Sequence, residues 1–430
     1  MVPAVGSARV VRPHSQWRAP ALRSTWARSR TRAAEAGRER KARVTWWLLF
    51  VNVLGPPEAG LFHLPKFAAE VITQGSLVSA VLLALIANPR VRLRPSLYLG
   101  IFTLLGLTSL MSSVRLVSVG TAYRGFRLLA FILVLWLLTP WWGRRGAPLL
   151  RAQLGFLCGV IGIVVVGALV SPGLAFSGGR LHGVIWPIPG TQVAHYSAEA
   201  AGLAGVLWIG KVIRGRQALL IAVPASVVLV LTHTRTALGG AVAGLVVAVL
   251  SLLVVRRRAR RVFVVSIAVG ALVLVPLSPL VVSWLARGES TTQIMDLSGR
   301  TKFWDLVFAE QRPMTNEVLG NGLANGQVDG YGYPIDSSWV EDYQDQGIAG
   351  DVLTACMFVA LLVCAAYRPR GPATAVALFL VVYCLIASFT EDGAGIASQY
   401  AMDLTVAASL LVPGAVQSLR PRVGDLGAAV

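Results

Sequence analysis

Charged side chains are scarce in this chain, at 14% of its 430 residues, whereas hydrophobic residues make up 55%. Soluble globular domains carry about 25% charged residues, so this composition excludes an ordinary soluble domain over the whole length. Acidic residues are the scarcer kind, with 20 Asp and Glu against 39 Lys and Arg. On so apolar a chain, the net charge of +19 is typical of membrane-orienting loops and of affinity for anionic lipid, and not of nucleic-acid binding.

Cysteines and common catalytic motifs are also few. The four cysteines lie inside apolar segments, at a spacing that matches no metal site, so we interpret them as small buried hydrophobes. They are Cys158, Cys356, Cys364 and Cys384. The chain has no Walker loop and no HExxH, GxSxG or DxD motif, which argues against P-loop ATPases and zinc hydrolases. We see no cleavable signal peptide pattern and no clear internal repeat.

Apolar runs long enough to cross about 30 Å of hydrocarbon recur along the chain. They predict an all-α polytopic membrane protein with about twelve transmembrane helices. The predicted spans are 44–63, 68–87, 97–113, 124–142, 152–171, 193–210, 217–232, 237–255, 262–286, 347–367, 372–389 and 396–413. The first span is the weakest of these, because Pro56, Pro57 and Glu58 interrupt it.

The distribution of Lys and Arg predicts the orientation. These residues concentrate in alternate segments, beginning with the N-terminal one, so we expect both termini in the cytoplasm and the protein in the cytoplasmic membrane. Residues 1–43 are rich in Arg, Ala and Ser and are expected to be a disordered basic tail. A transmembrane domain would cover 44–413, and a cytoplasmic tail 414–430. The long polar loop 287–346, between spans nine and ten, then lies on the outer face.

Ionisable residues within predicted spans gather in the outer halves of those spans. A charged side chain in hydrocarbon costs free energy, so such residues tend to have a function. Glu199 follows His195 by four residues, so the two share one helix face. Arg124 and Arg235 stand at outer span ends, and Asp403 lies in the outer half of the last span. A site at this depth suits an amphiphilic substrate with its tail in the bilayer. For Glu70 and Asp403 taken singly, an interfacial position in a water-filled vestibule is the better explanation.

Two outer loops add basic residues to this region. Arg180 and His182 lie in a Gly- and Pro-rich turn before span six. In the large loop, Arg300 and Lys302 follow Ser298, a candidate helix N-cap. Basic side chains at a helix N-terminus attract anions, so we predict an anion site there.

Acidic residues end the large loop. Asp336, Glu341, Asp342 and Asp345 lie close together in the sequence, just before span ten. One carboxylate beside a cationic pocket can act as a general base, and we expect the others to be solvated. Arg300 and Asp336 would then be the two halves of one site.

Three segments together resemble a known family. They are Thr234-Arg235-Thr236-Ala237-Leu238, then Ser298-Gly299-Arg300 with Trp304, Pro313 and Leu319-Gly320-Asn321-Gly322, and finally Asp336-Ser337-Ser338-Trp339-Val340 with Gly347 and Gly350. In this order the chain resembles the O-antigen ligase and polysaccharide polymerase family of integral-membrane glycosyltransferases, over roughly residues 90 to 412. Asp336 departs from the pattern, because ligase members carry His at this place.

The resemblance implies transfer of a glycan from an undecaprenyl-diphosphate carrier to a glycan or lipid acceptor, in surface or exopolysaccharide biosynthesis. It implies that Arg235 and Arg300 neutralise the diphosphate without a metal or cofactor, and that Asp336 is the base, with Glu199 and Glu341 in reserve. The expected secondary contacts with the substrate are Arg180, Arg124, Lys302 and His182.

Two other classes stay open. One is a transporter or flippase for an amphiphilic or glycolipid substrate, although only the short link 211–216 joins spans six and seven, without the long inner loop typical of two six-span halves. The other is a scaffold for envelope assembly. Convergence of Arg180, Arg235 and Arg300 in one outward cavity would favour the enzyme, and wide separation of the three would favour the scaffold or the transporter.

Overall fold

The structure, a computed structural model, describes residues 19–54, 61, 65–115, 119–266, 283–284, 300–323, 335–413 and 419. All regular elements in these ranges are helices, which confirms the all-α prediction. Six of them are long and apolar enough to cross a membrane. They are α2 (Lys66–Ala87), α3 (Leu97–Arg115), α4 (Val119–Leu137), α5 (Pro148–Val170), α9 (Arg235–Leu253) and α14 (Ser338–Ala366).

Apolar side chains on the outer faces of these helices support a membrane protein. On α2, for example, Val78, Leu82 and Ile86 stand in one row and are each more than half exposed. Such rows are unfavourable in water but match lipid chains. Two shorter apolar helices are α8 (Gly215–Leu231) and α15 (Pro372–Ala387). The total of about twelve spans stays a prediction, and most of the predicted span 262–286 lies outside the described residues.

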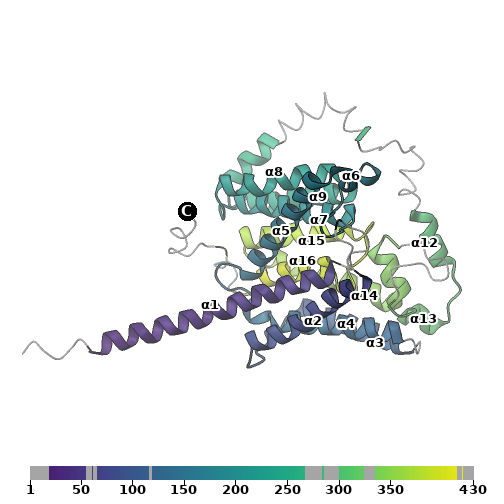
Figure 1. Cartoon of the computed structure of the whole chain (residues 1–430), viewed down its shortest axis with the longest axis horizontal. Coiled ribbons are helices and arrows are strands. Elements are labelled where there is room, and N and C mark those ends of the chain that lie inside the picture. The colour runs from purple at the N-terminus through teal and green to yellow at the C-terminus, as the bar shows by residue number, and fades with distance from the viewer. Residues whose placement is uncertain are drawn as a thin grey trace, which may run out of the picture.

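Helix α1 (Ala19–Val53) differs from the sequence prediction (Figure 1). Residues 19–43, which we expect to be disordered, continue the first apolar segment as one helix that projects from the body of the protein. The segment is rich in Ala and Arg, which favour helix, so the apolar helix that follows can continue back through it. Packing begins near Ala42, which is buried.

The helices form layers (Figure 1). On one side lie α5, α8, α9 and α7 (Gly190–Ile209), on the other α2, α3 and α4, and between them α15 and α16 (Gln399–Leu410). Every residue of α16 is buried, including its polar ones. Most residues of α7 are buried as well, so polar residues on α7, α15 and α16 face protein and not lipid.

Glycines allow α7 and α9 to lie close to α15. A Cβ atom at Gly202 of α7 would clash with the ring of Phe379, and one at Gly244 of α9 would lie 2.8 Å from the Phe379 carbonyl oxygen. Both contacts are shorter than side chains tolerate, so the close approach of these helices requires residues without a Cβ atom.

Gly202→Val is therefore expected to destabilise the protein by about 1–3 kcal/mol, because the added methyl groups force α7 away from α15. Gly239→Val is the matched control, since a Cβ atom there meets nothing within 4 Å. Thermal unfolding of both purified variants in detergent measures the difference. Equal unfolding temperatures would contradict the packing described for Gly202.

A kink at Gly347, with φ 68°, divides α14 into a polar first section and an apolar second section. The end of helix α13 (Met314–Leu319) packs at this kink, where a Cβ atom on Gly347 would lie 2.6 Å from the Glu317 carbonyl oxygen. The backbone N–H groups of Asn321 and Gly322 donate to the carbonyls of Gln344 and Asp345, at 2.8 and 2.9 Å. These contacts hold the two halves of the large loop together.

The same packing corrects the expectation that the acids of this segment are solvated. Glu341, Asp342 and Asp345 are each at most 2% exposed. Thr354 donates to Asp342 at 2.6 Å, and a Cβ atom at Gly395 would clash with the same carboxyl. The polar section of α14 is thus enclosed by α13 and by the loop between α15 and α16, which the one-dimensional pattern of charges does not indicate.

Candidate active site

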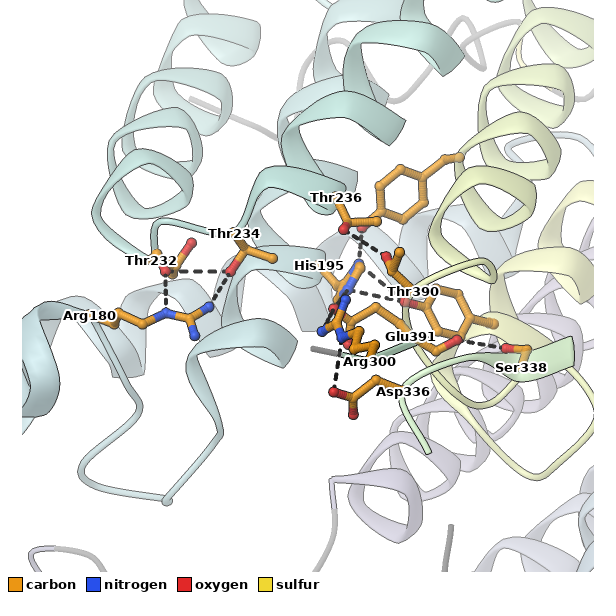
Figure 2. Close-up of polar contacts among 12 residues, drawn as sticks. Arg180, His195, Thr232, Thr234, Thr236, Arg300, Asp336, Ser338, Thr390 and Glu391 are labelled. Atoms are coloured by element: carbon orange, nitrogen blue, oxygen red, sulfur yellow. Dashed lines mark hydrogen bonds and ion pairs between the residues drawn. The ribbon is translucent and has the colours of Figure 1, made fainter. Parts of the chain in front are cut away.

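Four side chains from distant parts of the sequence meet at one end of the helix layers (Figure 2). Arg300, the first residue of α12 (Arg300–Ala309), donates from Nε to Oδ2 of Asp336 at 3.0 Å. Its Nη2 lies 3.8 Å from Oε1 of Glu391, and the same oxygen lies 3.9 Å from Nε2 of His195 on α7. One guanidinium, one imidazole and two carboxyls therefore form a continuous cluster.

Backbone contacts fix the loop that carries Glu391. This loop joins α15 to α16, and both the N–H and the hydroxyl of Ser338 donate to the Glu391 carbonyl oxygen, at 2.9 and 2.8 Å. The hydroxyl of Thr390 is 2.7 Å from that of Thr236, in the first turn of α9. The loop is thereby attached to both α14 and α9, so Glu391 is held rigidly beside His195.

A cavity of about 280 Å³ opens beside this cluster. Polar residues from α7, α16 and the loop between α15 and α16 line much of it, and they are Gln192, His195, Glu391, Asp392, Gln399 and Tyr400. The volume lies just below the roughly 300–1,000 Å³ that is usual for small-ligand sites. The cavity can hold one small polar group, such as part of a sugar.

Two tyrosine hydroxyls orient His195. Tyr400 lies 3.1 Å from Nε2, and Tyr383 makes a short hydrogen bond with Nδ1. The imidazole is only 4% exposed, so its position is set by α15 and α16 and not by solvent. A histidine held in this way beside a carboxylate can take part in proton transfer.

Crowding of acids changes the ionisation of the site. Burial raises the pKa of Asp336 above its usual range, although the neighbouring Arg300 opposes this. Burial, followed by repulsion from Glu391 and Asp336, raises the pKa of Asp392 to about 6. Asp392 reaches the cavity surface, but the recess keeps it away from bulk water, which explains the direction of the shift.

A raised pKa means that the folded state opposes ionisation of Asp392, so stability is lost as pH rises from the ordinary Asp value through about 6. We therefore expect Asp392→Asn to raise the unfolding temperature relative to wild type at about pH 7, with a smaller difference at about pH 4. Thermal unfolding at both pH values measures this, with exposed Asp305→Asn as control. A wild-type protein that is the more stable one at neutral pH would contradict the assignment.

The predicted arginines do not all reach this cluster. Arg180 donates to the Thr232 carbonyl at 3.0 Å and to the Thr234 hydroxyl at 3.1 Å, and in Figure 2 it lies apart from Arg300. Arg235 begins α9 between Thr234, which contacts Arg180, and Thr236, which contacts the Glu391 loop. The lining of the cavity includes none of Arg180, Arg235 and Arg300, so the expected convergence of the three arginines in one cavity is not observed.

Of the three other predicted substrate contacts, Arg124 and His182 have positions that suggest structural roles. Arg124 donates to the Leu323 carbonyl at 3.0 Å and so attaches α4 to the large loop. His182 accepts from the Gly190 N–H at 3.1 Å, and burial, followed by repulsion from Arg180, lowers its pKa. Lys302 is exposed on α12.

The two reserve bases lie away from the cavity surface. Glu199 is fully buried between Gln153 and Gln399, which donate to its two oxygens at 2.7 and 2.9 Å. Glu341 is 2% exposed in the first section of α14. Neither carboxyl lines the cavity described above.

Sequence reasoning missed Glu391, Asp392 and Tyr400 as site residues. The signal was present in Ser388-Phe389-Thr390-Glu391-Asp392-Gly393, a short polar segment between two apolar runs. For His195, the spacing in the sequence indicates only that it shares one helix face with Glu199. A search of every short outer loop for acids, and not only of the longest one, would have found Glu391.

No protein-family model and no curated protein matches this chain. Within the described ranges, no group of three or more His, Cys, Asp or Glu side chains is arranged to hold a metal ion. The assignment of function therefore rests on the site itself.

Proposed function

We propose that this protein is a membrane glycosyltransferase that polymerises or ligates glycan from an undecaprenyl-diphosphate carrier at the outer face of the cytoplasmic membrane. The observation that supports it most is the contact of Arg300 with Glu391, a residue that lines a polar cavity at the end of apolar helices. A lipid-diphosphate donor needs this combination, with a cation for the headgroup, a polar recess for sugar and apolar surface for the chain.

In the proposed reaction, the acceptor hydroxyl oxygen attacks the anomeric carbon of the donor sugar. The bond from that carbon to the diphosphate oxygen breaks, and the carrier diphosphate leaves with the electron pair. Arg300 stabilises the negative charge that grows on the leaving group, together with Arg235 at the start of α9. Placed donors of this kind act strongly because they need no reorganisation during the reaction.

The acceptor hydroxyl must also lose its proton. Asp336, the predicted base, is engaged by Arg300 at 3.0 Å and does not line the cavity. We therefore assign Asp336 to holding Arg300 and assign proton acceptance to Glu391, which lines the cavity beside His195. His195 then stabilises the Glu391 carboxyl before and after transfer.

Deletion of the protein, followed by sizing of surface and secreted polysaccharide, tests the function. Shortened chains are expected for a polymerase, and full-length chains left on the carrier for a ligase. Unchanged polysaccharide would contradict both. If the purified protein in vesicles moves the carrier-linked glycan across the bilayer without changing the length of the glycan, the protein is a transporter instead.

Arg235→Ala is expected to abolish polymer formation while the protein still inserts in the membrane. The change removes one of two proposed cations at the first residue of α9 and leaves the apolar residues of that helix intact. Complementation of the deletion strain, with membrane abundance measured in parallel, provides the test. Arg216→Ala, at an exposed position of α8, is the matched control. Wild-type chain length in Arg235→Ala would remove Arg235 from the site.

A further inference from the structure

Two acidic side chains lie together inside the helix layers, where the proposed reaction makes no use of them. Glu199 is at the middle of α7 and Asp403 is in the second turn of α16, and both are fully buried. Their carboxyls hydrogen-bond to each other. Buried acids in apolar helices are costly, so a pair of them in contact requires a physical explanation.

Glutamine side chains enclose the pair. Gln153 of α5 donates from Nε2 to Oε1 of Glu199 at 2.7 Å and makes a short hydrogen bond with Oδ1 of Asp403. Gln399 donates to the other Glu199 oxygen at 2.9 Å. The orientation of Gln153 is determined by Trp46, whose indole N–H donates to the Gln153 oxygen at 2.9 Å. Since an indole nitrogen only donates, the Gln153 amide must present both of its hydrogens to the carboxyls.

The remaining neighbours offer no positive charge. The titratable groups that face the pair are Tyr98 from α3, Tyr196 from α7, and Tyr383 and Cys384 from α15. Among the described residues that interact with either carboxyl, none is Lys or Arg. Two carboxylates in contact cannot both be ionised in a low-dielectric interior without a cation, so one of them must carry a proton.

One residue connects the pair with the cavity. Gln399 lines the cavity and donates directly to Glu199. The next residue, Tyr400, also lines the cavity and contacts His195. The carboxyl pair is therefore enclosed by protein but lies a single side chain away from a polar recess.

We propose that Glu199 and Asp403 form a proton-binding site, in which the two carboxyls share one proton that exchanges with the cavity beside Gln399. The site carries one negative charge in total. This assignment stands on the contacts of the pair and holds whether or not the protein transfers glycan.

Infrared spectroscopy of the purified full-length protein tests the proposal through the carbonyl band of protonated carboxyl groups at about neutral pH. Burial disfavours a charge on either acid, and a second negative charge on the neighbouring carboxyl adds to this penalty. Glu199→Gln relieves this repulsion, and the remaining carboxyl then ionises with amide donors around it. We expect Glu199→Gln, Asp403→Asn and the double variant each to lose the same intensity, that of one carboxyl.

Two results would overturn the proposal. No loss of the band in any variant means that both acids are ionised in wild type, and twice the loss in the double variant means that each acid binds its own proton. The two single variants report independently, so a variant that fails to fold leaves the other as a test. Other buried acids also contribute to this band, so the loss should be unchanged when measured in a Glu341→Gln background.

Transfer to heavy water tests the link with the cavity. The part of the band that disappears in Glu199→Gln is expected to shift in the wild-type protein as its proton is replaced by deuterium. Gln399→Leu puts an apolar side chain between the pair and the cavity and is expected to slow that shift. A band that stays unshifted in wild type, or one that shifts equally fast in Gln399→Leu, would show that the proton does not pass by way of Gln399.

Discussion

Arg300→Ala is expected to lower the rate of glycan transfer by about 10²- to 10³-fold, the range measured when one donor that stabilises a developing negative charge is removed. The guanidinium contacts Asp336 and Glu391 at once, at 3.0 and 3.8 Å, so its removal takes the positive charge away from both carboxyls. Turnover of carrier-linked glycan by the purified protein measures the effect. The loss should appear in kcat more than in KM, because the charge develops in the transition state.

The controls separate charge from folding. Arg370→Ala removes an exposed arginine from the link between α14 and α15 and should retain full activity. Arg300→Lys keeps the charge without the planar fork, so we expect partial activity between wild type and Arg300→Ala. If Arg300→Ala turns over glycan at the wild-type rate, the cluster at Asp336 and Glu391 is not the active site.

Glu391→Gln is expected to lower the rate by about 10²-fold or more, as general-base removal does in other enzymes. The substitution keeps the size of the side chain, and the backbone contacts of Ser338 with the Glu391 carbonyl are unaffected. The change therefore removes the negative charge beside His195 and Arg300 and leaves the backbone of the loop in place. We expect the acidic limb of the pH–rate profile to change as well.

Asp336→Asn is the comparison that assigns the base. Asp336 lies within the same cluster but only Glu391 lines the cavity, so Asp336→Asn should weaken the hold on Arg300 while leaving the pH dependence of turnover in its wild-type form. A larger loss in Asp336→Asn than in Glu391→Gln, together with an altered pH profile, would return the role of base to Asp336.

The helical architecture and the pairing of Arg300 with Asp336 could be predicted from the sequence. Apolar runs of membrane length predict helices directly, because a backbone in hydrocarbon must satisfy its hydrogen bonds within each segment. Arg300 and Asp336 end two polar segments of the same loop, and the structure brings them within hydrogen-bond distance. The helices follow from local composition, and the pairing follows from the opposite charges of two residues in one loop.

Three-dimensional contacts decided the rest. Glu391 enters the cluster because Thr390 and Ser338 attach its loop to α9 and α14, contacts between residues that are far apart in the sequence. Arg180 was expected beside Arg300, but it instead satisfies the ends of α8 and α9 at Thr232 and Thr234. The acids Glu341 and Asp342 were expected in water, but they are enclosed where α13 packs at the Gly347 kink.

By itself, the sequence determined that this chain is helical and apolar, with its polar residues concentrated in a few segments, because hydrophobicity and periodicity act residue by residue. Only the tertiary structure decided which of those polar residues face one cavity and which are sealed inside. Which residues face the cavity depends on how α7, α15 and α16 pack. That packing needs glycines such as Gly202, whose contact Phe379 is far away in the sequence. The Glu199–Asp403 pair illustrates the reason. The two acids are far apart in the sequence, and only the packing of α7 against α16 brings their carboxyls into contact.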